Sequence, residues 1–155
     1  MAHPAIIRQV MATQAVMETS LRPLLTADLG SPPSGQVLVR YLWLCLAHSD
    51  VERVRVLFLD GRGHLLRDEE IARGDNRHAV LDPRAIVRRC LDLGAQRLVV
   101  AHNHPSGDPA PSVTDRRATD SLVAAARLFN IQVVDHVVLA SGGWSSMRAL
   151  GWLGK

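Results

Sequence analysis

The residue types that could do chemistry are concentrated in residues 102–115, which read HNHPSGDPAPSVTD. His102 and His104 follow the β-prone run 97–101, and residues i and i+2 of a strand point to the same side. The two imidazoles can therefore reach one point, and the Pro- and Gly-rich segment after them can bring the Asp115 carboxylate back to it. Two imidazoles and a carboxylate are a typical ligand set of catalytic zinc, with the fourth position left for water. We therefore predict a hydrolytic metal site that binds one Zn²⁺ per chain.

A simpler interpretation of part of this segment is a helix start. Ser112 and Asp115 fit the S-x-x-D pattern, with Ser112 as the N-cap and Asp115 at the third helical position. The two interpretations are compatible, because the backbone of Ser112 can begin a helix while its hydroxyl faces the metal site. The adjacent letters His-Asn-His are no evidence for the nuclease motif of that name, whose residues are spread over a hairpin and a helix.

Amide hydrolysis also needs a general base and a proton for the leaving nitrogen. A candidate is Glu52, at the entrance to a predicted strand over 52–59. By its spacing alone, Glu52 is a solvated carboxylate at a strand start, and the residues themselves do not select it as a base.

The order Glu52, His102-x-His104, seven residues, Ser112, two residues and Asp115 resembles the JAMM motif of the JAB/MPN metalloprotease superfamily. More narrowly, the chain is similar to the bacterial RadC family, historically labelled a DNA repair protein, over roughly residues 35–153. The similarity is carried by four segments: VLFLDGRG (56–63), DPRAIVRRCLDLGA (82–95), AHNHPSGDPAPSVTD (101–115) and VVDHVVLASG (133–142). This resemblance implies an α/β fold of the α+β type, a mixed curved β-sheet flanked by helices in the JAB/MPN (cytidine deaminase-like) architecture.

The resemblance also implies roles for the site residues. Glu52 would be the general base and Ser112 would donate a hydrogen bond to the developing oxyanion, beside a zinc held by His102, His104 and Asp115. The leading hypothesis is a zinc-dependent hydrolase that cleaves an amide or isopeptide bond in a peptide or protein substrate. The alternative is a non-enzymatic module of DNA repair or recombination with a structural metal. Full-length RadC relatives usually carry a helix-hairpin-helix module, for which the residues before position 35 are too few.

Composition supports one globular domain. The chain has 155 residues, of which 47% are hydrophobic and 21% charged. We expect an N-terminal helix and linker over 1–33 and the metal-binding domain over 34–155. The longest apolar stretch, 37–47, is too short to cross a bilayer and no signal peptide is visible, so a cytoplasmic protein without membrane association is expected. Cys45 and Cys90 are expected to be reduced core residues.

The net charge of +3 is weak support for DNA binding. All 18 basic residues except Lys155 are arginines, and they are scattered along the chain. Aromatic residues make up 4%, which provides no stacking platform for single strands. The sequence indicates no particular substrate and no oligomeric state.

The hydrophobic periodicity predicts helices over 4–25, 35–47, 83–93 and 112–130, and strands over 52–59, 64–73, 97–102, 131–140 and 144–149. The last helix is expected to face inward with Leu122, Ala125, Ala126, Leu128 and Phe129, and the second helix with Val37, Leu38, Tyr41, Leu42 and Cys45.

Two further groups of polar residues have open interpretations. Asp135 and His136 lie in the strand 131–140, where they either orient a metal ligand by hydrogen bonding or form a satisfied buried pair. His48, His64 and His78 fit no motif and are expected on the surface.

Overall fold

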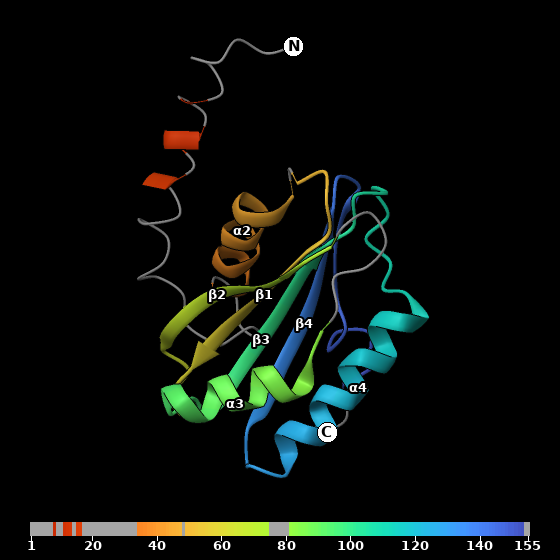
Figure 1. Ribbon diagram of the computed structural model, residues 1–155. Helices are drawn as coiled ribbons and strands as arrows, with labels where there is room; N and C mark the ends of the chain where they lie inside the picture. The colour runs from red at the N-terminus through yellow and green to blue at the C-terminus, as the bar shows by residue number, and fades with distance from the viewer. Residues whose placement is uncertain are drawn as a thin grey trace.

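The computed structural model describes residues 8, 11–13, 15–16, 34–47, 49–74 and 81–153. In the described part of the chain, five strands form one sheet, and helices pack on both of its faces (Figure 1). The elements are α2 (Ser34–Leu46), β1 (Arg53–Leu59), β2 (Leu65–Arg73), α3 (Pro83–Leu93), β3 (Arg97–Asn103), α4 (Val113–Arg127), β4 (Gln132–Ala140) and β5 (Gly143–Ser146). Of the predicted helix 4–25, the described residues are helical and the others lie outside the described part, as do His48 and His78.

The sheet is mixed, with the strand order β2-β1-β3-β4-β5. Only β3 and β4 pair in parallel, and the other neighbours are antiparallel. The central strands β1 and β3 are rich in valine and leucine and are buried on both faces, because helices cover both sides of the sheet. This arrangement confirms the predicted α/β class.

Each face of the sheet has its own core. On one face α2 packs with Leu38, Tyr41, Leu42 and Cys45, as predicted, against alternate residues of β1, β3 and β4. On the other face α3 and α4 cover Val56, Phe58, Leu98 and Val100 and contribute Ile86, Cys90, Leu122 and Ala126. Both cysteines are therefore buried, as predicted. In the described part of the chain, no helix combines the length and the apolar character needed to span a bilayer.

The connection from β3 through α4 to β4 positions the candidate site. Because β3 and β4 are parallel, α4 must begin near the end of β3 and run back along the sheet. His102 and His104 at the end of β3 therefore lie beside the first turn of α4, which carries Asp115.

Two predicted boundaries were wrong. The helix predicted over 112–130 ends at Arg127, and Leu128 and Phe129, expected to face inward, are 81% and 51% exposed. The chain leaves the helix because the N–H of Ile131 turns back to the carbonyl of Ala126 and Asn130 has a positive φ of 56°.

The last strand is Gly143–Ser146 rather than 144–149. The residues after Ser146 form turns, in which the N–H of Leu150 bonds to the carbonyl of Ser146. Hydrophobic pattern alone does not distinguish such a turn from a strand, since Met147 is apolar and buried although it lies in the turn.

Candidate metal centre

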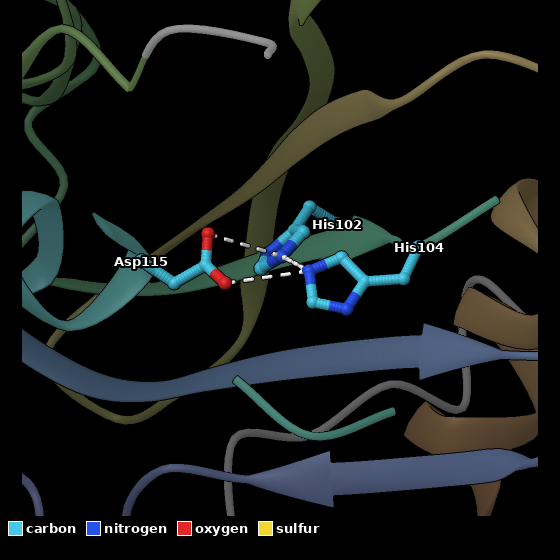
Figure 2. A group of neighbouring side chains, drawn as sticks. All are labelled: His102, His104 and Asp115. Carbon is cyan, nitrogen blue, oxygen red and sulfur yellow. Dashed lines mark hydrogen bonds and ion pairs between the residues drawn. The ribbon is translucent and has the colours of Figure 1, made fainter. Parts of the chain in front are cut away.

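His102, His104 and Asp115 converge on one point between β3 and α4 (Figure 2). The Nε2 atoms of the two histidines lie 2.9 Å apart. The Asp115 carboxylate faces both, with one oxygen 3.5 Å from Nε2 of His102 and the other 3.3 Å from Nε2 of His104. The side chain of His102 is 2% exposed, while those of His104 and Asp115 are 16% and 14% exposed, so the cluster opens to solvent on the His104 side.

Asp115 also belongs to the start of α4. The Ser112 hydroxyl oxygen accepts a hydrogen bond from the Asp115 N–H at 3.1 Å, and the Asp115 carboxylate accepts one from the Ser112 N–H at 2.7 Å. This is a complete capping box, which satisfies two N–H groups that a helix start leaves without partners. The capping and metal-binding interpretations therefore describe the same carboxylate, whose orientation toward the histidines is fixed by the cap.

His104 is held by the loop that follows it. Its backbone N–H bonds to the carbonyl of Leu139, and its ring Nδ1 lies 2.9 Å from the carbonyl oxygen of Asp108. A carbonyl only accepts, so Nδ1 carries the proton and Nε2 of the neutral ring keeps its lone pair toward the cluster. The loop reaches this position through Gly107, whose φ of 89° strains any residue with a Cβ.

The electrostatics of the cluster favour a cation. Burial of the Asp115 carboxyl raises its pKa, but the ability of the carboxylate to bond a proton shared with the facing Nε2 atoms of His102 and His104 outweighs the burial and leaves the pKa far below its usual range. A second proton, gained at Nε2 of His104, would be donated to the Asp115 carboxylate, and this is the main cause that raises the pKa of His104; the negative charge of Glu52 also contributes. The carboxylate is thus ionised at neutral pH and attracts positive charge to the ring nitrogens.

These residues fit a bound metal ion. The candidate ligand atoms lie within 4.8 Å of one another, and the cluster provides one carboxylate and two imidazole nitrogens. Electron-rich atoms that face each other at 2.9 Å in a mostly buried site repel one another unless a proton or a cation lies among them. Two histidines and a carboxylate suit Zn²⁺ and also other transition metals.

Asp135 and His136 are neighbours in β4, and their side chains lie on opposite faces of the strand. His136 is buried, and its Nε2 lies 2.7 Å from Nδ1 of His102. Its other nitrogen lies 2.6 Å from the hydroxyl of Thr119 on α4. Burial lowers the pKa of His136 well below the usual value, so the ring is neutral. His136 therefore contacts a candidate ligand.

Asp135 has a different environment. Its carboxylate accepts hydrogen bonds from the Ser146 hydroxyl at 2.5 Å and from the backbone N–H groups of His136 and Arg148. Burial raises its pKa against these hydrogen bonds. Asp135 thus fixes the turn after β5. Away from the cluster, His64 is exposed, as predicted.

Glu52 is placed by the register of β1 on β3. Val54 lies opposite His102, and continuation of this antiparallel register brings Glu52 level with His104 on the same face of the sheet. The Glu52 carbonyl accepts a hydrogen bond from Gly74 at 2.8 Å, which ties this residue to the end of β2. The negative charge of Glu52 is also near enough to His104 to contribute to the rise in the pKa of that histidine.

Asn103, between the two histidines, holds the segment that carries Glu52. The Asn103 side chain is buried and points to the opposite side of β3 from the histidine rings. Its oxygen accepts from the Arg53 N–H at 2.8 Å, and its nitrogen donates to the carbonyls of Ser49 and Val51 at 3.2 and 3.0 Å. Sequence reasoning missed this role, although an amide at the end of a buried strand was a signal that a backbone partner exists.

Replacing Asn103 by alanine is expected to destabilise the protein by about 1–3 kcal/mol, because backbone groups near Glu52 lose their hydrogen-bond partners. Urea unfolding of the metal-free protein measures the change. Ser121→Ala, which removes an exposed hydrogen bond within α4, is the control and should have a much smaller effect. Equal stability of the Asn103 variant and the wild type would show that the Ser49–Arg53 segment is held by other contacts.

A hollow of about 370 Å³ lies beside His104 and is lined by Ala47, Ser49, Asp50, His104, Pro105 and Ser141. Of the three candidate ligands, His104 alone lines this hollow. Ser112 is exposed at the start of α4, three residues before Asp115.

Comparison with known proteins identifies the family. Residues 33–152 match the RadC-like JAB domain. A UPF0758 protein of Rhodobacter capsulatus is 44% identical over 120 residues, which cover 77% of this chain and 56% of that protein. The chain therefore spans little more than half the length of the curated relative that it matches.

Proposed function

Because this chain belongs to the RadC-like JAB domain family, we propose that it is a zinc-dependent hydrolase that cleaves an amide or isopeptide bond in a peptide or protein. The observation that carries the proposal is the convergence of His102, His104 and Asp115 on one partly open point. These three side chains would hold the ion. Zn²⁺ in such a site supplies a Lewis acid that lowers the pKa of water toward neutrality and polarises a carbonyl.

The residues around the cluster supply the remaining chemistry. A carboxylate oxygen of Glu52 takes the proton of the attacking water and later delivers it to the leaving nitrogen. The Ser112 hydroxyl oxygen already accepts a hydrogen bond from the Asp115 N–H. The hydroxyl proton remains available, and it is donated to the oxyanion that develops on the substrate. The hollow beside His104 gives the substrate its approach.

The alternative of a structural metal in a DNA-associated module has less support. A structural zinc site usually has four protein ligands, whereas the candidate group found in the described residues has three members. Several arginines already pair with carboxylates of the same sheet: Arg53 with Glu70, Arg55 with Asp68 and Arg89 with Glu69. These three guanidinium groups already have partners within the fold, so they are less available for phosphate contacts.

Metal removal tests the proposal. Zinc-loaded protein is incubated with a mixed peptide library and with branched peptides joined through lysine side chains, and newly formed amines are identified by mass spectrometry. We expect cleavage that disappears after treatment with a zinc chelator and returns when zinc is added. Cleavage that survives complete zinc removal would overturn the proposal. Stoichiometric zinc without cleavage, together with salt-dependent DNA binding, would favour the structural alternative.

A further inference from the structure

The hydrogen bonds behind His102 form a chain that ends on another candidate ligand. His102 contacts His136, His136 contacts the hydroxyl of Thr119, and that hydroxyl lies 2.7 Å from the backbone carbonyl oxygen of Asp115. Thr119 and both histidines are buried, so no solvent is needed to complete these bonds. Thr119 lies one helical turn after Asp115 and faces the same side of α4.

The donor and the acceptor of each hydrogen bond in this series can be assigned from the Asp115 carbonyl at its end. The Asp115 carbonyl can only accept, so the single hydroxyl proton of Thr119 is donated to it. The Thr119 oxygen must then accept from Nδ1–H of His136. A neutral imidazole has one proton, which leaves Nε2 of His136 as an acceptor.

The consequence appears at the cluster. Nδ1 of His102 must donate to Nε2 of His136, at 2.7 Å, and therefore carries the only proton of the neutral His102 ring. Its Nε2 keeps a lone pair, 3.5 Å from the Asp115 carboxylate and 2.9 Å from Nε2 of His104. In free histidine the proton favours Nε2, so without the chain the nitrogen that faces the cluster would more often be protonated.

We propose that Thr119 and His136 are positioning residues that hold His102 as the Nδ1–H tautomer and so keep its Nε2 open for the metal. The inference deepens the proposed function, since it concerns the same metal site. His104 reaches the same tautomer by a shorter route, through the Asp108 carbonyl. His102 and His104 therefore both present Nε2 to the cluster, although His136 accepts from the Nδ1–H of His102 and a backbone carbonyl accepts from that of His104. Outer partners of this kind orient a metal-bound histidine and make it a better ligand.

The register of β4 on β3 supports the assignment. The pairing shifts between Leu98 and Val99, so that Val99 lies opposite Asp135 and Val100 opposite His136. Without this irregularity Asp135 would occupy the face that bears His102, because a shift of one residue exchanges the two faces of a strand. The irregular pairing thus selects the imidazole, which can both donate and accept, to support His102.

Thr119→Val tests this series of hydrogen bonds, because valine has the shape of threonine but no hydroxyl. Zinc affinity, measured by competition with a chromophoric chelator, is expected to fall about 10- to 100-fold. Nitrogen NMR of the metal-free protein, with histidine labelled at both ring nitrogens, is expected to show His102 moving from the Nδ1–H form toward the Nε2–H form. Thr119→Ser, which keeps the hydroxyl, should restore both properties. Thr114→Val, an exposed change in the same helix, is the control.

A second pair of variants covers the case in which Thr119→Val folds poorly. His136→Gln keeps an oxygen that can accept from His102, whereas His136→Leu keeps volume without an acceptor, so the glutamine variant should bind zinc more tightly. Wild-type affinity and an unchanged His102 tautomer in Thr119→Val would overturn the inference, as would equal affinities of the two His136 variants. The tautomer is read without metal or substrate. It therefore tests the chain even if the protein proves not to be a hydrolase.

Discussion

Replacing Asp115 by asparagine is expected to abolish tight zinc binding while the start of α4 stays intact. Asparagine keeps an oxygen that can accept the Ser112 N–H, so the capping box can persist. It loses the negative charge that faces both Nε2 atoms at 3.3 and 3.5 Å. Because a ligand itself is weakened, the affinity loss should exceed the roughly 10- to 100-fold loss expected for an outer partner.

Ser112→Ala is the matched control for Asp115→Asn. Alanine removes the oxygen that accepts the Asp115 N–H and should cost about 1 kcal/mol of stability. The three candidate ligands remain, so zinc binding should stay close to that of the wild type. Calorimetric zinc titration and thermal unfolding of both variants separate the two roles. If Asp115→Asn bound zinc normally and only its melting temperature changed, the carboxylate would be a cap and not a ligand.

Local sequence signals predicted much of the site. Alternation along β3 indicated that His102 and His104 share a side, and the S-x-x-D pattern indicated the helix start at Ser112. These inferences succeed because they depend on residues close together in the chain. The proximity of Asp115 to the histidines also depended on the parallel β3–α4–β4 connection, which the order of elements only suggested.

The supporting residues could not be derived in this way. His102 and His136 are 34 residues apart in the sequence. Their contact depends on the irregular register of β4 on β3, which side-chain periodicity does not reveal. The position of Glu52 relative to the histidines depends on the register of β1 on β3. Spacing did not select Glu52 as the base candidate, and only the resemblance of the sequence to a known motif did. Leu128 and Phe129 were wrongly predicted to be helical and buried. The hydrophobic pattern of the helix continues through them in the sequence, but the backbone leaves the helix after Arg127.

Glu52→Gln is expected to remove hydrolysis while zinc content stays at the wild-type level. Glutamine is nearly isosteric with glutamate but cannot take a proton from water at neutral pH. A positioned general base contributes on the order of a hundred-fold or more to the rate, so the zinc-dependent cleavage should fall by at least about that factor. The candidate ligands His102, His104 and Asp115 are unchanged, and the backbone bond from Gly74 to the Glu52 carbonyl does not involve the side chain.

The comparison requires a control for charge, because Glu52→Gln also removes one negative charge. Asp120→Asn makes the same change in net charge at an exposed position of α4 and should leave both cleavage and zinc content unaltered. Cleavage of the peptide library and bound zinc are measured on the same preparations of the three proteins. Loss of zinc from Glu52→Gln would make Glu52 a fourth ligand, and a closed site of four ligands would favour the structural alternative. Full zinc with undiminished cleavage would mean that another group takes the proton.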